Sequence, residues 1–577
     1  MVKEFSHNRN NVILNFSLNY CKTSKELLES KGFFAVLKHF IRQQKKEDTL
    51  LIERLESFSQ ERPLSDILLE LFKLLLILDT KEVKNLNPEY HAILEDTTDI
   101  IDFVEGLYFY WRHLERYALI QKDNITSGIE HNQFIKANNN FANLILTTYR
   151  LIEHNITNSY PNVYRQAHAG INVGFVLSHV ETDLPKQYNQ LKPINTISKI
   201  ILTPPFIMYP IMNKREGFFE EVFTNPLEDI AINTDHFFCY PAKVGEFFTY
   251  IYFHRDFLSQ GIALANLFEL ATQEEIKGKR PDLIYVFGAR NSDKTKETVF
   301  YDDQENDLLV GYVSNTESID YFGYMKKMIL TLHNVKMLNQ GHLPMHGAMV
   351  NITLKNGLSA NIAIIGDSGA GKSESLEALR TLSEDHLKEM KIIFDDMGTF
   401  KVEDNTVKGY GTEIGAFVRL DDLDMGYSFK EMDRAIFMNP NRINARVILP
   451  ITTYQTIQKG YPVDVLLYAN NFEDNDETIV LFENVEKAKE TYIKGARKAK
   501  GTTNETGVVT SFFANPFGPL QRQDQTLDII DKTYDTLFDT AIPVGQMYTK
   551  LAIEGFERKG PEEAALALFD WLMTNKH

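Results

Sequence analysis

The spacing of apolar residues separates a helical first part of the chain from a strand-rich remainder. Up to about residue 190, segments such as SKELLESKGFFAVLKHFIRQQKK and DFVEGLYFYWRHLERYALI place apolar side chains three and four positions apart, which is the period of one helix face. Glycine is sparse there, and no phosphate or metal motif occurs. We therefore expect residues 1–190 to form a helical accessory domain, with a protein partner as its expected contact.

Short runs of β-branched and aromatic residues begin near residue 195. The runs SKIILTPPFIMYPI, EFFTYIYF, PDLIYVFG and LLVGYVS are bounded by proline, glycine or aspartate, which is typical of strands that end in turns. From about residue 336 onward, strand and helix patterns alternate. The sequence therefore predicts an α/β protein that is α+β overall, with a mixed α/β domain on the substrate side over 195–335 and an α/β domain over 336–577.

Composition and charge indicate where the protein acts and which kinds of partner it binds. The net charge of −18 disfavours general binding to nucleic acid. The most apolar early run, 67–79, is interrupted by Glu70 and Lys73 and is too short for a membrane span. The N-terminus lacks an apolar signal core, and the two cysteines, Cys21 and Cys239, are too few for a disulfide framework. We therefore expect a cytoplasmic protein that contacts neither nucleic acid nor membrane.

The stretch NIAIIGDSGAGKSESLEALR, at 361–380, carries the strongest chemical signal. It fits the pattern G-x-x-x-x-G-K-[ST], with a strand pattern before the glycines and a helix pattern after them. Glycines let backbone N–H groups approach phosphate oxygens, and the helix N-terminus adds the positive end of its dipole. The expected nucleotide-binding residues are Gly366, Asp367, Ser368, Gly369, Ala370, Gly371, Lys372, Ser373 and Glu374.

Acidic residues follow at a spacing that suits a metal ion beside the phosphates. The run MKIIFDDMGTF ends an apolar strand pattern with Asp395 and Asp396, about twenty residues beyond the glycine-rich turn. Hard cations prefer oxygen ligands, and the hydroxyl of Ser373 is the usual Mg²⁺ ligand of such a turn. The pattern therefore predicts ATP and Mg²⁺ as cofactors, with Lys372 on the outer phosphates.

An ordered set of short segments resembles phosphoenolpyruvate carboxykinase, especially its ATP-dependent class. IDYFGYMKKM at 319–328 and LPMHGAMVN at 343–351 precede the glycine-rich turn and the segment IIFDDMG. INARVILPI at 443–451 and GTTNETGVVTSFFANPFGPL at 501–520 follow in the family's order. The resemblance implies a P-loop carboxykinase-like nucleotide-binding domain with a mixed sheet, preceded by a strand-rich substrate domain.

The resemblance also implies a second metal ion. By it, Lys327, His346 and Asp396 would be ligands of a transition metal such as Mn²⁺, while Asp395 and Ser373 would serve the Mg²⁺–nucleotide. A lysine binds a metal only when neutral, which requires a lowered pKa. Imidazole and carboxylate suit Mn²⁺.

The implied reaction converts oxaloacetate and ATP to phosphoenolpyruvate, CO₂ and ADP. Tyr321 would lie at the substrate pocket, and Arg446 would pair with a substrate carboxylate or with the transferring phosphoryl group. Together with Lys372 and Asp395, these residues form the expected catalytic set. A guanidinium offers two parallel donors to a carboxylate or phosphate, which suits the role given to Arg446.

Departures from that family keep a second function open. The Gly-Asp-Ser-Gly turn followed by Glu374 is closer to HPr kinase/phosphorylase, which shares the nucleotide-binding superfamily. Gly347 stands in place of the carboxykinase cysteine, and the family's late nucleotide-contacting arginine, expected near Asn504, is missing. The nearest candidate for an early substrate arginine is Arg290.

The alternative is therefore a P-loop kinase that phosphorylates a hydroxyl of a protein or a small molecule. In that enzyme Asp395 or Asp396 would act as the base, and no second metal is required. A third hypothesis is a non-catalytic nucleotide sensor, against which the intact Lys372 and Ser373 argue.

Overall fold

The structure is a computed structural model of the whole chain. It describes residues 4–8, 11–16, 18–47, 50–59, 62–113, 115–119, 134–159, 162–165, 173–202, 205–228, 230, 232–291, 297–382, 386–420, 432–499 and 507–575. The described part is mixed α/β with several mixed sheets, which confirms the predicted class. Asn504 and the start of the segment 501–520 lie outside the described residues.

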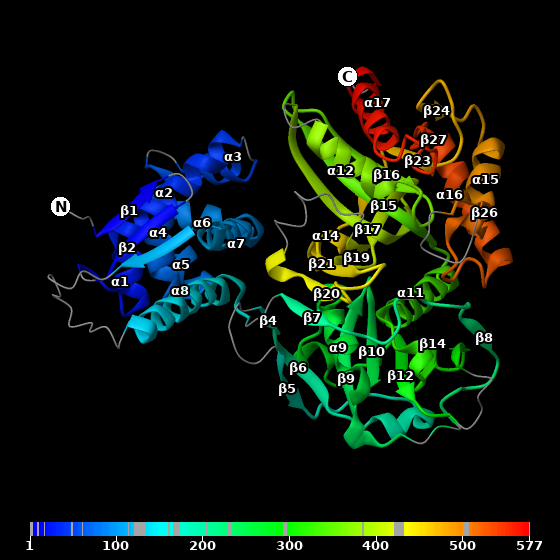
Figure 1. Cartoon of the computed structure of the whole chain (residues 1–577), viewed down its shortest axis with the longest axis horizontal. Coiled ribbons are helices and arrows are strands. Elements are labelled where there is room, and N and C mark those ends of the chain that lie inside the picture. Colours follow the sequence, from blue (N-terminus) through cyan, green and yellow to red (C-terminus); the bar gives the residue numbers. More distant parts are fainter. Residues whose placement is uncertain are drawn as a thin grey trace. The chain divides into compact units, whose positions relative to one another are not determined.

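The chain forms two compact units, residues 1–161 and 162–577, drawn in Figure 1. The helical region expected over 1–190 overlaps the second unit, because β4 (Val163–Arg165) and β5 (Val173–Ser178) both pair with β6 of that unit. The second unit contains both of the later predicted ranges, and their separation into two domains stays a prediction.

The first unit is built mainly of helices. They are α1 (Ser24–Glu29), α2 (Lys31–Lys46), α3 (Leu50–Ser57), α4 (Leu64–Leu75), α5 (Thr80–Lys84), α6 (Pro88–Glu95), α7 (Thr97–His113) and α8 (Phe134–Thr157). The strands β1 (Phe5–Asn8), β2 (Asn11–Asn15) and β3 (Glu115–Leu119) form a small sheet. None of the helices in the described residues is both long and apolar enough to cross a membrane.

Helix α2 shows why this sequence folds locally as expected. Ser30 caps its start, because the Ser30 hydroxyl accepts a hydrogen bond from the Phe33 N–H at 3.1 Å. Val36, Phe40 and neighbours at the same spacing are buried, and Lys45 and Lys46 occupy the last turn, where cations oppose the negative end of the helix dipole. The buried face joins the core of the first unit.

The second unit contains a ten-stranded mixed sheet. Its central path runs β4-β6-β9-β10-β12-β14-β13-β8, with β5 beside β6 and β11 beside β9. The remaining bounds are β6 (Thr196–Leu202), β8 (Glu220–Val222), β9 (Phe237–Val244), β10 (Phe247–His254), β11 (Glu269–Leu270), β12 (Leu283–Ala289), β13 (Thr298–Asp303) and β14 (Leu308–Ser314), with α9 (Leu258–Ala263) and α10 (Gln273–Ile276) between strands. The strands predicted from EFFTYIYF, PDLIYVFG and LLVGYVS are confirmed as β10, β12 and β14.

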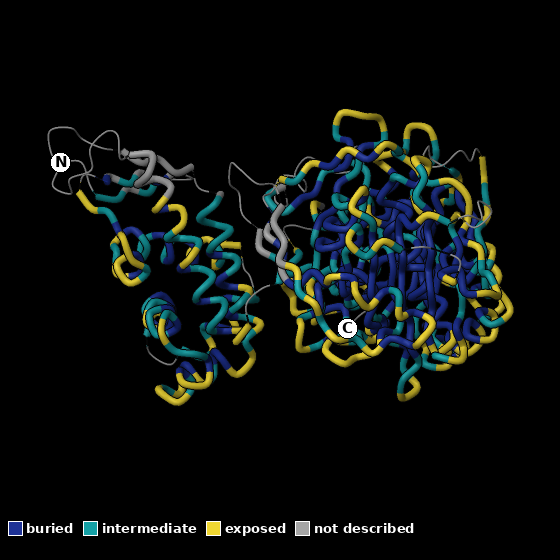
Figure 2. The backbone as a smooth tube through the Cα atoms, turned by 90° about the horizontal axis from the view of Figure 1, so that it is seen from below, coloured by how far each residue is buried: buried dark blue, intermediate teal, exposed yellow. Residues whose placement is uncertain are grey.

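An eight-stranded mixed sheet carries the glycine-rich turn. Its order is β22-β18-β17-β15-β16-β23-β27-β24. The bounds are β15 (Leu343–Leu354), β16 (Ser359–Ile365), β17 (Leu387–Glu403), β18 (Thr406–Gly411), β22 (Tyr461–Pro462), β23 (Val465–Asn470), β24 (Ile479–Leu481) and β27 (Val544–Tyr548). The helices α12 (Lys372–Leu382) and α17 (Lys559–Asn575) share one apolar cluster with the sheet, while α15 (Val485–Lys494) and α16 (Gln523–Asp539) share another. Figure 2 shows the resulting buried interior in dark blue.

Helix α11 (Phe322–Asn339) lies between the two large sheets, since it contacts β12 and β14 of the first and β15 of the second. Most of its residues are buried, including the charged Lys326. A helix that is buried on every side must satisfy its polar groups internally, so the lysines of α11 need carboxylate partners from neighbouring elements.

A four-stranded sheet joins distant parts of the second unit. Its order is β19 (Gly415–Arg419), β21 (Arg446–Pro450), β20 (Ile436–Met438) and β7 (Phe206–Met208), and β7 pairs in parallel with β20. A two-stranded sheet contains β25 (Ala496–Lys498) and β26 (Val508–Thr510), and the short helix α14 (Tyr454–Gln458) follows β21.

Gly415 marks a close approach between two backbones. A Cβ at Gly415 would lie 1.9 Å from the carbonyl oxygen of Asn266 and 2.6 Å from that of Leu449. We expect Gly415→Ala to lower the free energy of unfolding by about 2–3 kcal/mol, because neither obstacle is a flexible side chain. The control is Gly278→Ala, whose backbone φ is +66° but whose Cβ meets nothing within 4 Å, and which should cost about 1 kcal/mol. Denaturant unfolding of both variants measures this, and equal losses would contradict the close approach.

Candidate functional site

The predicted strand, turn and helix are present at the glycine-rich segment. Strand β16 ends at Ile365, helix α12 begins at Lys372, and the turn lies between them. Gly369 and Gly371 have φ values of +77° and +93°, in the region that favours glycine. A Cβ at Gly371 would lie 2.5 Å from the Thr549 hydroxyl oxygen. The two glycines are therefore required by backbone conformation, and the second also by packing.

Residues from neighbouring strand ends hold the turn in place. The Thr549 hydroxyl donates to the Ala370 carbonyl at 2.7 Å, and the Asn471 amide donates to the Gly369 carbonyl at 2.9 Å. These residues directly follow β27 and β23, which run parallel to one another. The turn thus lies at one edge of the sheet, beside the ends of two neighbouring strands, where open α/β sheets commonly bind ligands.

Lys372 lies against the turn instead of extending away from it. Its ammonium group donates to the carbonyl oxygens of Gly366 and Asp367 at 2.7 and 3.1 Å, and the residue is only 6% exposed. The charge is therefore held among the backbone groups that would surround a phosphate chain. Glu374 follows in the first turn of α12.

Asp367 anchors the turn through a buried ion pair. The Arg497 guanidinium donates to the Asp367 carboxylate at 2.8 Å, and the Ser368 N–H donates to it at 2.7 Å. Burial alone would raise the pKa of Asp367, but the nearby His346 and Arg497 lower it below its ordinary value. Arg497, on β25, was not singled out by the sequence; its role depends on a contact across 130 positions of the chain.

The two adjacent aspartates lie on β17 beside β15. The Ser373 hydroxyl is 3.3 and 3.4 Å from the two carboxylate oxygens of Asp395, so the two residues expected to hold Mg²⁺ lie side by side. Burial raises the pKa of Asp395, and the charge of Asp396 raises it further. Asp396 has φ of +89°, a conformation that a non-glycine residue rarely adopts and that often marks a functional position.

Asp396 is the centre of a compact polar cluster. Lys327 donates to one of its carboxylate oxygens at 2.8 Å, and the His346 Nε2 lies 2.9 Å from the other. Lys326 contacts the same carboxylate at 2.6 Å. Burial would raise the pKa of Asp396, but the two ammonium groups and the imidazole hold it well below its ordinary value. The structure thus brings together the three residues expected to bind the second metal.

A metal site at this cluster would need Lys327 as a third ligand beside His346 and Asp396. Among the described residues, no three His, Cys, Asp or Glu side chains form a group that could hold a metal ion. Lys327 completes the pair of His346 and Asp396, and burial lowers its pKa from the ordinary value, which favours the neutral amine that can bind a metal. The imidazole is held from its other side, where Nδ1 lies 3.0 Å from the Ala514 carbonyl oxygen. These observations fit a nitrogen and oxygen site for a divalent metal.

Tyr321 and Arg446 meet beside this cluster around the ring of Phe417. The ring lies 6.1 Å from that of Tyr321, 5.4 Å from the Arg446 guanidinium and 5.9 Å from the Lys326 ammonium. Burial raises the pKa of Tyr321, and Arg446 opposes this rise. Both residues therefore lie around the same ring as Lys326, which contacts Asp396.

Two further residues enter the site without a motif. Arg215 lies 5.5 Å from the ring of Phe517, and the same ring lies 4.6 Å from the Lys327 ammonium. Glu413 contacts Lys326 at 2.9 Å, and both side chains are fully buried. By contrast, Arg290 is exposed directly after β12. Only the spatial arrangement could identify Arg215 and Glu413, because neither stands in a recognisable pattern.

No protein-family model matches the chain, and a search of curated proteins finds no match.

The buried Glu413 gives a measurable pH dependence. Burial raises its pKa from 4.5 to about 7, although Lys326 opposes the rise. Between these values the unfolded chain releases a proton that the folded protein keeps, so the free energy of unfolding should fall as the pH rises, by up to about 3 kcal/mol. We expect Glu413→Gln to lose this fall. Urea unfolding of both proteins from about pH 5 to about pH 8 tests it, and parallel curves would contradict the assignment.

Proposed function

We propose that the protein is an ATP-dependent phosphoryl-transfer enzyme of the phosphoenolpyruvate carboxykinase type, converting oxaloacetate and ATP to phosphoenolpyruvate, CO₂ and ADP. One observation carries the proposal. Two adjacent carboxylates belong to two different clusters. Asp395 contacts Ser373 of the glycine-rich turn, and Asp396 contacts Lys327 and His346. A nucleotide-bound metal and a substrate-bound metal would then lie side by side.

The nucleotide would bind in the glycine-rich turn. Backbone N–H groups and the start of α12 favour phosphate oxygens, and Lys372 supplies the positive charge. Ser373 and Asp395 would hold Mg²⁺ through oxygen ligands. Thr549 and Asn471 would keep the turn from changing shape when a phosphate chain enters.

The substrate would bind at the Asp396 cluster. A divalent metal held by Lys327, His346 and Asp396 would polarise the substrate's carbonyl group and stabilise negative charge on its oxygen. Arg446 and Arg215 would take the carboxylates of a small dianionic substrate, since a guanidinium pairs with carboxylate through two donors. The buried phenol of Tyr321 would exclude water and orient the substrate beside the phosphate chain.

A hydroxyl kinase is the second candidate, and the raised pKa of Asp395 favours it. A carboxylate whose pKa is raised by burial is a better base for a hydroxyl proton, because its basicity lies closer to the working pH. The Asp-Ser-Gly turn supports the same reading. In this enzyme Lys327 would remain a cation beside the acceptor.

Removing Lys372 tests the nucleotide site. We expect Lys372→Ala to reduce ATP-dependent turnover by at least about a hundredfold, because a charge on the transferring group contributes several kcal/mol in the transition state. Its circular dichroism should stay that of the parent. Lys355→Ala, an exposed lysine after β15, is the control and should retain activity. Near-normal turnover by Lys372→Ala would contradict the proposal that phosphoryl transfer takes place at this turn.

Lys327 separates the two candidates. A carboxykinase carrying Lys327→Met should lose oxaloacetate-dependent ADP formation, and a higher Mn²⁺ concentration should restore part of it, because the variant lacks one metal ligand. The exposed Lys277→Met serves as the control. The assay follows ADP and CO₂ released from oxaloacetate. If the parent protein releases no CO₂ with ATP and Mn²⁺, the carboxykinase proposal fails and the hydroxyl kinase becomes the better account.

A further inference from the structure

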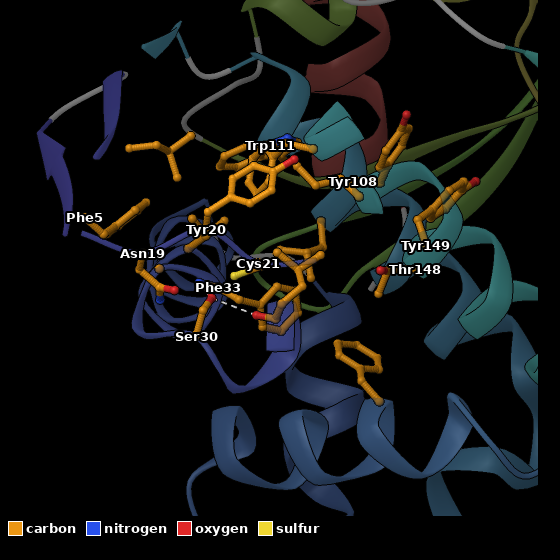
Figure 3. Close-up of a pocket in the computed structure, with 18 of the residues that line it drawn as sticks. Phe5, Asn19, Tyr20, Cys21, Ser30, Phe33, Tyr108, Trp111, Thr148 and Tyr149 are labelled. Atoms are coloured by element: carbon orange, nitrogen blue, oxygen red, sulfur yellow. Dashed lines mark hydrogen bonds between the residues drawn. The ribbon is translucent and has the colours of Figure 1, made fainter. Parts of the chain in front are cut away.

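The first unit contains a cavity that the proposed reaction does not use. It has a volume of about 120 Å³ and is shown in Figure 3. Side chains from β1, β2, the segment before α1, and helices α1, α2, α4, α7 and α8 line it. An engineered apolar cavity of about 150 Å³ accommodates benzene, so this volume suits one six-membered ring.

Aromatic side chains form much of the wall. The rings of Phe16 and Phe141 lie 5.5 Å apart at 63°, and those of Trp111 and Phe141 lie 6.5 Å apart at 72°. Tyr108 and Tyr149, which also line the cavity, stack at 4.2 Å. Such walls favour an aromatic ring by edge-to-face contact, and their faces also attract a cation.

The charge on the described part of the wall has one sign. Among the described residues that line the cavity, Glu4 is the only Asp, Glu, Lys, Arg or His, and Asn19 donates a hydrogen bond to its carboxylate. Burial raises the pKa of the Cys21 thiol, and Glu26 and Glu4 raise it further, so the thiol stays neutral. A ligand that places a positive charge near Glu4 therefore meets complementary charge, and a carboxylate ligand meets repulsion.

We propose that this cavity binds an arylalkyl amine, with its single ring between the aromatic walls and its protonated amino group beside Glu4. The single ring of the amine matches the volume of the cavity and its aromatic lining. The ammonium group complements the negative charge of Glu4, the one Asp, Glu, Lys, Arg or His that the described lining contains. This site lies in a different unit from the glycine-rich turn, so it stands whether or not the proposed reaction does.

Trp111 makes the proposal directly measurable. The chain has two tryptophans, and the other, Trp571, lies on α17 in the second unit. In full-length Trp571→Phe protein, 2-phenylethylamine should change the Trp111 fluorescence saturably, and 3-phenylpropionate should bind at least about fivefold more weakly. Glu4→Gln should weaken the amine by about fivefold, as for a partly exposed ion pair, and leave ethylbenzene binding unchanged.

A second charge-removing variant, at Glu29, serves as the control. Glu29→Gln removes the same charge from an exposed position on α1 outside the lining, and it should bind the amine as the parent does. Equal weakening by Glu29→Gln and Glu4→Gln would reduce the effect to general electrostatics and overturn the assignment of the ammonium group. A lack of saturable binding by both the amine and ethylbenzene up to millimolar concentration would overturn the site itself. Glu4 and Glu29 both lie outside the apolar clusters of the first unit, so neither glutamine substitution removes a core side chain.

Discussion

The carboxylate of Asp396 is the constraint on which the rest of the site depends. It accepts contacts from Lys326 and Lys327 of α11 and from His346 of β15. Helix α11 packs on the ten-stranded sheet, whereas β15 and β17 belong to the eight-stranded sheet. A single side chain therefore ties the two sheets together where the proposed substrate would bind. Its φ of +89° stores backbone strain that the pairing of β17 with β15 must offset.

Local chemistry made the glycine-rich turn predictable. The glycines are needed for positive φ at two positions, and Lys372, Ser373 and the adjacent aspartates stand at fixed short spacings. The strands β10, β12 and β14 were likewise predictable, because a run of β-branched and aromatic residues between turn residues is a local signal. The convergence of Lys327, His346 and Asp396 came from resemblance and not from spacing, and the contacts described above are consistent with it.

Long-range contacts account for what the sequence did not reveal. Arg215 reaches the cluster from a loop more than a hundred positions before Lys327, and Arg497 meets Asp367 across 130 positions. The pairing of β7 with β20 joins Phe206 to Ile436. No periodicity in either segment indicates its partner, because pairing depends on how the whole chain folds. The same limit applies to β4 and β5, which continue a sheet that begins beyond the helical part.

Two consecutive lysines at one carboxylate need different roles. Successive side chains on a helix point about 100° apart, so Lys326 and Lys327 approach Asp396 from different sides. Lys326 also contacts the buried Glu413. Burial would lower the pKa of Lys326, but the carboxylates of Asp396 and Glu413 raise it above its ordinary value. Lys327 has Asp396 as its ion-pair partner among the described residues, and burial lowers its pKa. Asp396 and Glu413 together raise the pKa of Lys326, whereas burial lowers that of Lys327, so Lys327 is the lysine of the pair that would give up its proton to a metal.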